Sequence, residues 1–380
     1  RRLHPDCHVR PLRVRAGPGP RLVREHRRGR PGVRVGPEHP EAVQPGETEH
    51  RVPVDRPARV GGGGRVRDGH ELNEPAAGVH PHDAQISVMQ MESNPVFLAA
   101  RRHQELLRKL ESVVANQQRL WESAPRYATV EKRGEVEADE FVERYVRGSR
   151  PLVLTGLTAD WPAMKRWSPN YLKQHFGHLS VEIQCKRNSD ARYEENKLDH
   201  REVQLCGDFV DRVVSGGPTN DYYMTANNEA LRQPGFAPLL DDIGSLPPIC
   251  DRAQLSRSSS FWFGPAGTVT PLHHDTLMLF HTQVVGRKRW RFISPLDTPK
   301  LYNFNGVFSP IDVDKPDLKR FPLFADVTML EVVVEAGETV FLPLGWWHQV
   351  TSLDVSLSFS FSNLNIPNQF SYANPTMPDW

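Results

Sequence analysis

Cysteine is scarce in this chain, and long apolar runs are absent. Its four cysteines, Cys7, Cys185, Cys206 and Cys250, are widely separated and form no C-x-x-C pair. Neither a disulfide framework nor a zinc ribbon is therefore indicated, and a reducing compartment, the cytoplasm, fits best. No apolar run approaches the roughly 20 residues that a membrane helix needs, and no signal peptide opens the chain. We expect a soluble protein that is not secreted and has no membrane partner.

An excess of charge of one sign is also missing. The 47 Lys and Arg residues nearly balance the 46 Asp and Glu residues, which leaves a formal net charge of +1. A protein whose main task is to neutralise nucleic-acid phosphates would carry more positive charge. The balanced charge therefore does not indicate nucleic acid as a partner, although it is compatible with a local basic patch.

The first 85 residues contain no Phe, Tyr, Trp, Ile, Lys, Met or Ser, while Arg, Gly, Pro and Val are abundant. Such a segment cannot bury enough apolar surface to offset its conformational entropy, so we predict disorder over residues 1–88. Either it is a basic arm that binds nucleic acid, or it is an extension foreign to the native protein. We favour the second, because arginine without lysine suggests a GC-rich stretch translated from a misassigned start. Met89 or Met91 would then be the first residue.

An amphipathic helix is predicted next, within a helical segment at residues 89–125. From Asn94 to Trp121, apolar residues recur at spacings of three and four, and Pro125 should end the helix. It could form a homodimer or pack against the core of its own chain, and we expect the second. The remainder, residues 126–380, is predicted to be one catalytic domain that begins with mixed α/β segments.

After Ser260 the chain reads as β. Runs of branched and aromatic residues separated by glycine or proline predict strands at residues 268–275, 277–285, 288–293, 332–334, 339–342 and 355–361. The last run alternates serine with leucine or phenylalanine, which predicts a packed outer face and a wet or liganded inner face. Many short strands predict a mainly β fold, a jelly roll whose interior can hold a ligand.

One constellation in this part carries chemistry. His273 and Asp275 stand two residues apart in a predicted strand, so their side chains share a face that His274 does not. His348 begins another strand far downstream. Two histidines and one carboxylate that leave open coordination positions form the facial triad of non-haem Fe(II) oxygenases. An H-x-D triplet alone is weak, because a chain with 16 His produces one by chance.

A lysine strengthens this interpretation. Lys288 directly follows the pair Gly286-Arg287, which we interpret as the turn of a tight hairpin. Lys288 shares a strand face with Trp290 and Phe292, and a lysine among apolar neighbours is costly unless it binds an anion. The far carboxylate of 2-oxoglutarate is such an anion. The alternative is a surface lysine beside two arginines.

At these residues the sequence resembles the JmjC-domain proteins of the cupin-like branch, including its asparaginyl hydroxylases and related small JmjC hydroxylases. The stretch from Phe261 to Phe361 carries the matching motifs, and the resemblance reaches back to about Arg126. Those motifs are Trp262-Phe263-Gly264, the run from Gly267 to Asp275, the run from Gln283 to Arg289, the run from Gly337 to Pro343, and Gly345-Trp346-Trp347-His348.

The resemblance implies a double-stranded β-helix and assigns roles to individual residues. His273, Asp275 and His348 would bind Fe(II), while Lys288 and Thr270 would bind the far carboxylate of 2-oxoglutarate. Tyr223 would reach the same carboxylate, although Tyr222 is adjacent and either could be core. Ser360 would lie near the cosubstrate, or would only be one of a row of serines.

One position departs from the family pattern. Relatives commonly have Asn six residues after the first histidine, where this chain has Leu279. A polar contact near the cosubstrate is thereby lost, and His281, two residues later, could replace it.

The family chemistry is the oxidation of a C–H bond by O₂, coupled to conversion of 2-oxoglutarate to succinate and CO₂. We predict hydroxylation of a side chain in a protein or peptide substrate. N-methyl-lysine demethylation ranks second, and hydroxylation of tRNA or a small molecule ranks third. A non-catalytic cupin that only binds a ligand is the rival from another class. Such proteins usually lose a metal ligand or the cosubstrate cation, and here all of them are present.

Overall fold

The computed structural model describes residues 94–123, 129–226, 228–303 and 306–368. All of them belong to one compact unit, Val79–Trp380. The predicted disordered segment, residues 1–88, lies outside the described residues, as does Pro125.

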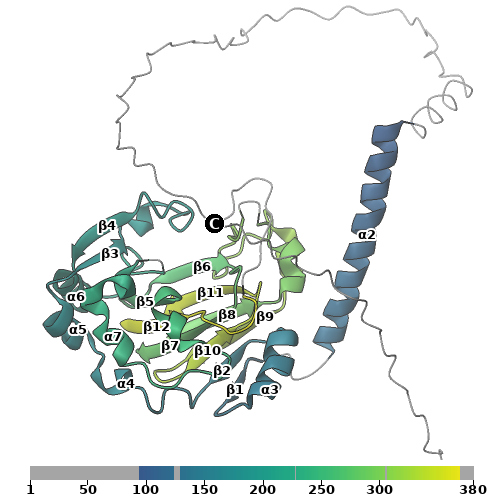
Figure 1. Cartoon of the computed structure of the whole chain (residues 1–380). Helices are drawn as coiled ribbons and strands as arrows, with labels where there is room; N and C mark the ends of the chain where they lie inside the picture. The colour runs from purple at the N-terminus through teal and green to yellow at the C-terminus, as the bar shows by residue number, and fades with distance from the viewer. Residues whose placement is uncertain (1–93, 124–128, 227, 304–305, 369–380) are drawn as a thin grey trace, which may run out of the picture. The chain divides into compact units, whose positions relative to one another are not determined.

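Two sheets face each other and form the body of the protein (Figure 1). The smaller sheet has the order β6-β11-β8-β9, and its strands are Val269–His273, Trp347–Ser352, Lys288–Ile293 and Met329–Val334. The larger sheet has the order β1-β2-β10-β7-β12-β5, and its strands are Glu131–Arg133, Leu152–Leu154, Thr339–Leu342, Leu279–Val285, Ser356–Phe361 and Ser259–Gly264. The fold is the predicted jelly roll, and the bounds of β8 and β10 coincide with the predicted strands.

Short helices and a small ribbon cover the outer face of the larger sheet. The helices are α3 (Ala138–Phe141), α4 (Ala163–Arg166), α5 (Pro169–Phe176), α6 (Cys206–Ser215) and α7 (Pro238–Asp241), and the ribbon is β3 (Ser180–Gln184) with β4 (Arg201–Leu205). Two adjacent residues fix the start of α5: Ser168 Oγ accepts the backbone N–H of Tyr171 at 3.1 Å, and Pro169 occupies the first turn.

The main hydrophobic core lies between this helical layer and the larger sheet. Phe359 and Phe361 on β12 join Phe280 on β7 and Phe341 on β10 in one cluster with Trp161 and other residues of the layer. The serines of β12 point the opposite way, into the barrel, and Ser356 and Ser358 are fully buried there. The predicted packed outer face is confirmed, while the inner face is wet only toward Ser360, which lines a pocket.

The tight turn after β7 does not form the predicted hairpin. Gly286 has a φ of +75°, as the turn demands, but β7 pairs with β10 and β12, whereas β8 pairs with β11 and β9. The chain crosses here from one sheet to the other. The hairpin prediction was wrong because a short Gly-X turn can also form a corner, in which the chain passes from a strand of one sheet to a strand of the other.

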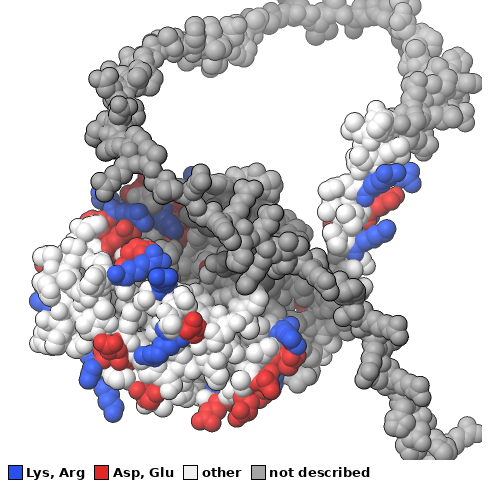
Figure 2. Space-filling model, in the orientation of Figure 1, with Lys and Arg blue, Asp and Glu red and all other residues white. Residues whose placement is uncertain are grey.

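The long helix α2 (Pro95–Glu122) starts where it was predicted, with Asn94 Oδ1 accepting the N–H of Val96. Its apolar side chains are exposed over most of its length, including Leu106, Leu110 and Val113, and Figure 2 shows charged side chains on one side of it. Only its last turns touch the body, where Trp121 packs on Trp346 with ring centroids 5.5 Å apart. The expected packing of this helix against the core of its own chain is therefore limited to these last turns. No helix in the described ranges has the length and apolar character of a membrane span.

The short strand β1 precedes the helical layer and runs parallel to β2 at the edge of the larger sheet. Its three residues, Glu131, Lys132 and Arg133, are all charged. Glu131 accepts hydrogen bonds from Arg144 at 2.9 Å and from the Tyr145 hydroxyl at 3.1 Å, which ties the strand to the π-helical turn Val142–Arg147 that continues α3.

Candidate active site

Two histidines and a carboxylate converge at one end of the barrel. β6 and β11 pair antiparallel with His273 directly opposite His348, and Asp275 follows β6 by two residues. The ligand atoms of these three side chains all lie within 4.8 Å of one another, and His348 Nε2 lies 3.8 Å from Asp275 Oδ2. Side chains 73 residues apart are thus neighbours, because strand register places them so.

Backbone contacts orient both imidazoles. His273 Nδ1 lies 2.8 Å from the Pro271 carbonyl oxygen, and His348 Nδ1 lies 3.0 Å from that of Trp346. Each Nδ1–H can donate to its carbonyl, which leaves the Nε2 lone pair free for a cation. Burial lowers the pKa of His348 well below its usual range, so this ring is neutral. Two imidazoles and one carboxylate fit a divalent transition metal such as iron.

His274 is not part of this group of ligand atoms. Its ring packs edge-on against Trp347 with centroids 4.7 Å apart, and its backbone N–H donates to the Val307 carbonyl at 3.0 Å. Burial is the main cause that lowers its pKa. The predicted alternation of side chains at positions 273, 274 and 275 is therefore what the structure has.

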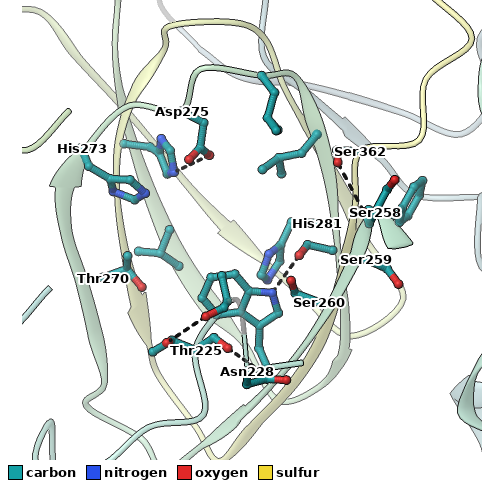
Figure 3. A pocket seen from close by; sticks show the side chains of 18 of the residues that line it. Thr225, Asn228, Ser258, Ser259, Ser260, Thr270, His273, Asp275, His281 and Ser362 are labelled. Carbon is teal, nitrogen blue, oxygen red and sulfur yellow. Dashed lines mark hydrogen bonds and ion pairs between the residues drawn. The ribbon is translucent and has the colours of Figure 1, made fainter. Parts of the chain in front are cut away.

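A cavity of about 850 Å³ opens beside these residues and runs between the two sheets. Figure 3 shows His273 and Thr270 on one wall of it, and His281 and Ser260 on the other. Lys288, Tyr223, Thr270 and Ser360, which were predicted from sequence to surround a cosubstrate, all line this cavity.

Lys288 is buried deep in this cavity, with 1% of its surface exposed. Its ammonium group donates to the Tyr223 hydroxyl at 3.0 Å and lies 5.6 Å from the ring centroid of Trp262. Burial lowers the pKa of Lys288 to about 7. No salt bridge to this lysine exists in the described part of the chain, so the site has a cation without its anion.

The hydroxyl-bearing candidates differ in their surroundings. Tyr223 is buried beside Lys288, whereas the adjacent Tyr222 bonds the Arg212 carbonyl oxygen in the helical layer. Ser360 Oγ accepts the indole N–H of Trp262 at 2.8 Å and keeps its own proton to donate. Thr270 contributes to the cavity wall opposite it.

Sequence reasoning gave no role to two aromatic residues of this cavity. Trp262 was noted only as part of a motif, yet its ring flanks both Tyr223 and His281. Phe308 stacks on His273 with centroids 5.6 Å apart and pairs with it across an isolated bridge. The alternation along β5 could have indicated Trp262, but no local signal places Phe308, which lies on an irregular loop.

Comparison with known families identifies the domain. The profile of the cupin-like domain family matches residues 137–367, which include both sheets except β1.

Among individual proteins, this chain is similar to lysine-specific demethylase 8 of Xenopus tropicalis, with 32% identity over 59% of this chain and 50% of that protein. It is also 32% identical to lysine-specific demethylase JMJ30 of Arabidopsis thaliana, over 61% of this chain and 54% of that protein. Identity to tRNA wybutosine-synthesizing protein 5 of Gallus gallus is 28%, over 59% of this chain and 75% of that protein. The chain spans about half the length of the two demethylases. It belongs to the cupin-like JmjC family of Fe(II)- and 2-oxoglutarate-dependent oxygenases.

Proposed function

We propose that this protein hydroxylates a side chain of a protein or peptide, with Fe(II) bound by His273, Asp275 and His348. One observation carries the proposal: the convergent triad opens into the same cavity that holds a buried lysine without an anion. Iron bound there would supply the activation of O₂, coupled to conversion of 2-oxoglutarate to succinate and CO₂.

In this proposal Lys288 and the hydroxyls of Thr270, Tyr223 and Ser360 bind 2-oxoglutarate. The ammonium group of Lys288 neutralises the far carboxylate, and the Tyr223 hydroxyl, which now accepts from Lys288, holds the ammonium in place. The apolar rings around Lys288 exclude water, so the charge-assisted bond is stronger than it would be at the surface.

The substrate would enter from the open side of the cavity. Arg232, Arg257 and Ser258 line that part, and they offer polar groups to a polar chain. The volume of about 850 Å³ leaves room for a substrate side chain beside the cosubstrate. A peptide is therefore our first choice of partner. A cytoplasmic location stays a prediction from the cysteine pattern.

N-methyl-lysine demethylation is the second candidate, and the names of two relatives favour it. It begins with oxidation of an N-methyl carbon, so the same residues would serve. The name of a third relative makes tRNA the third candidate substrate. A non-catalytic cupin is disfavoured because the donor set is complete.

Two measurements test the proposal. Succinate should form when the protein is supplied with Fe(II), O₂ and 2-oxoglutarate, and His348→Ala should form none. Mass spectrometry of a protein extract treated with the enzyme then looks for added oxygen or lost methyl groups. Absence of succinate from the unaltered protein, with or without extract, would contradict the oxygenase proposal, and loss of methyl groups alone would favour the second candidate.

A further inference from the structure

Two nitrogen-bearing side chains meet at the deep end of the cavity, and no carboxylate of the described residues pairs with either of them. Lys288 Nζ lies 3.4 Å from His281 Nε2, and both residues are buried, with 1% and 4% of their surface exposed. We propose that His281 is a cosubstrate-binding residue, and that its imidazole and the Lys288 ammonium together hold the far carboxylate of 2-oxoglutarate. This inference rests on the proposed function and adds a residue to it.

The corner between the sheets creates this pair. His281 belongs to β7 of the larger sheet and Lys288 to β8 of the smaller one, and the Gly286 turn joins the two strands. A hairpin would have placed them side by side in one sheet. Instead they face each other across the interior, so a carboxylate between them can be reached from both sides.

Aromatic rings fix the imidazole in this position. The His281 ring lies 5.5 Å from that of Trp262 and 5.0 Å from that of Trp290, measured between centroids. With the ring held in this way, little conformational entropy is lost when a ligand binds. The His281 ring is thus preorganised for binding. A residue that only packs the core would not need a fixed ring orientation.

The neighbours of His281 on the same face of β7 cannot take its place. Leu279, one step nearer the triad, has no polar group. Gln283, one step deeper, donates to the Val285 carbonyl at 2.7 Å and to Ser356 at 2.9 Å, and accepts from Ser358 at 2.9 Å. His281 therefore carries the polar group that this strand offers to a ligand.

The chemistry of the ring suits a carboxylate. In the free protein His281 Nε2 can accept from the Lys288 ammonium. When a carboxylate lies between them, the tautomer with its proton on Nε2 donates to the anion, and no net protonation is needed. A second donor stands near: the indole N–H of Trp290 is buried and finds no acceptor among the described residues, although Trp290 lines the cavity.

The test measures binding as well as turnover, in the full chain. His281→Phe keeps an aromatic ring between Trp262 and Trp290 but removes both nitrogens, whereas His281→Gln keeps a donor. Glutarate titrated into metal-free protein by calorimetry probes the deep end alone. 2-Oxoglutarate titrated without oxygen into the Fe(II)-loaded protein probes the whole site. His178→Gln, an exchange at an exposed histidine, is the matched control.

We expect His281→Phe to weaken binding of both dicarboxylates by at least about tenfold, since a hydrogen bond to a charged group is lost. Its iron content should stay at that of the unaltered protein. His281→Gln should retain part of the affinity, and it decides the matter if His281→Phe does not fold. Affinities of His281→Phe within twofold of the original, or of His281→Gln if His281→Phe does not fold, would overturn the inference and leave the proposed function standing. If the unaltered Fe(II)-loaded protein binds no 2-oxoglutarate, the proposed function fails, and this inference fails with it.

Discussion

Adjacent histidines at positions 273 and 274 have opposite surroundings, and this gives a prediction at the scale of single residues. His273→Ala should abolish stoichiometric iron binding and succinate formation, because it removes one of three proposed ligands. His274→Ala should retain most of the iron, since that ring packs against Trp347. Iron content of the purified variants, measured beside succinate production, checks this. Loss of metal from His274→Ala but not from His273→Ala would mean that the assigned triad is wrong.

Burial of Lys288 should lower the free energy of unfolding, although this residue serves cosubstrate binding. Its pKa falls from 10.5 to about 7 because burial penalises the charged form. The unfolded chain therefore binds the proton more tightly, and the cost of burying this lysine is largest below about pH 7 and vanishes above about pH 10.5. We predict that Lys288→Met raises the free energy of unfolding by about 1–3 kcal/mol near neutral pH.

Chemical denaturation of Lys288→Met and the unaltered protein, both free of cosubstrate, measures this difference. It should shrink as the pH rises toward 10. In the same variant the 2-oxoglutarate requirement should increase at least about tenfold, because a charge-assisted bond worth roughly 1.5–3 kcal/mol is lost. A variant that is both less stable and equally active would show that Lys288 is a structural residue.

The sequence allowed the candidate site to be predicted where chemistry and strand alternation agree. Two-residue alternation identified the shared face of His273 and Asp275, and a lysine beside Trp290 was suspicious because apolar neighbours make it costly. Tyr223 could not be separated from Tyr222 by sequence, because both lie in a short extended segment. The deciding contact, Lys288 to Tyr223, joins residues 65 apart.

At the scale of elements, the corner at Gly286 gives a prediction with an internal control. Gly286 and Gly217 have similar positive φ values, +75° and +71°, but a Cβ at 286 would collide with the Val355 carbonyl oxygen, while the space at 217 is open. Gly217→Ala should cost about 1 kcal/mol from backbone strain alone. Gly286→Ala should cost roughly 2–4 kcal/mol, since the backbone must also move.

Thermal and chemical unfolding of these two variants gives the comparison. Equal losses of stability would show that the corner can relax around an added methyl group. A larger loss at Gly286, together with weaker cosubstrate binding, would show that the turn also holds β7 and β8 in their relative positions.

Elements were predicted well where the pattern is local and poorly where partners are remote. The start of α5 follows from Ser168 and Pro169, which lie within one turn of each other. The partner of β7 does not follow from its own residues, because the same Gly-X signal fits a hairpin and a corner. Likewise, the apolar stripe of α2 indicated its helical period correctly, but a stripe alone does not reveal what covers it.

At the scale of the whole molecule, we predict that a chain beginning at Met89 keeps full activity. The residues before it contain no aromatic side chain that could join a core. Circular dichroism and succinate production, compared with those of the 380-residue chain, measure the effect. A large loss of either would show that the preceding segment contributes to folding or catalysis.

The overall architecture could be predicted because the motifs are specific to one family and lie in the strands of the barrel. Between residues 170 and 250 the sequence carries no such motif, and the helices and the ribbon that the chain forms there cover the larger sheet. The positions of these covering elements depend on packing against Phe280, Phe341 and Phe359, contacts over distances in sequence that local patterns do not encode.

Strand β1 covers the edge of the larger sheet and so protects the domain against edge-to-edge aggregation. The family match begins at residue 137, after this strand. A protein cut there would lose Glu131, Lys132 and Arg133 and would uncover the rim of β2, which is Leu152, Val153 and Leu154, all buried in the intact chain. An apolar rim with unpaired N–H and C=O groups is a template for another strand, whereas three charged residues discourage it. A protein cut at the start of the family match should therefore aggregate through this edge, and we expect a stable domain to begin before Glu131.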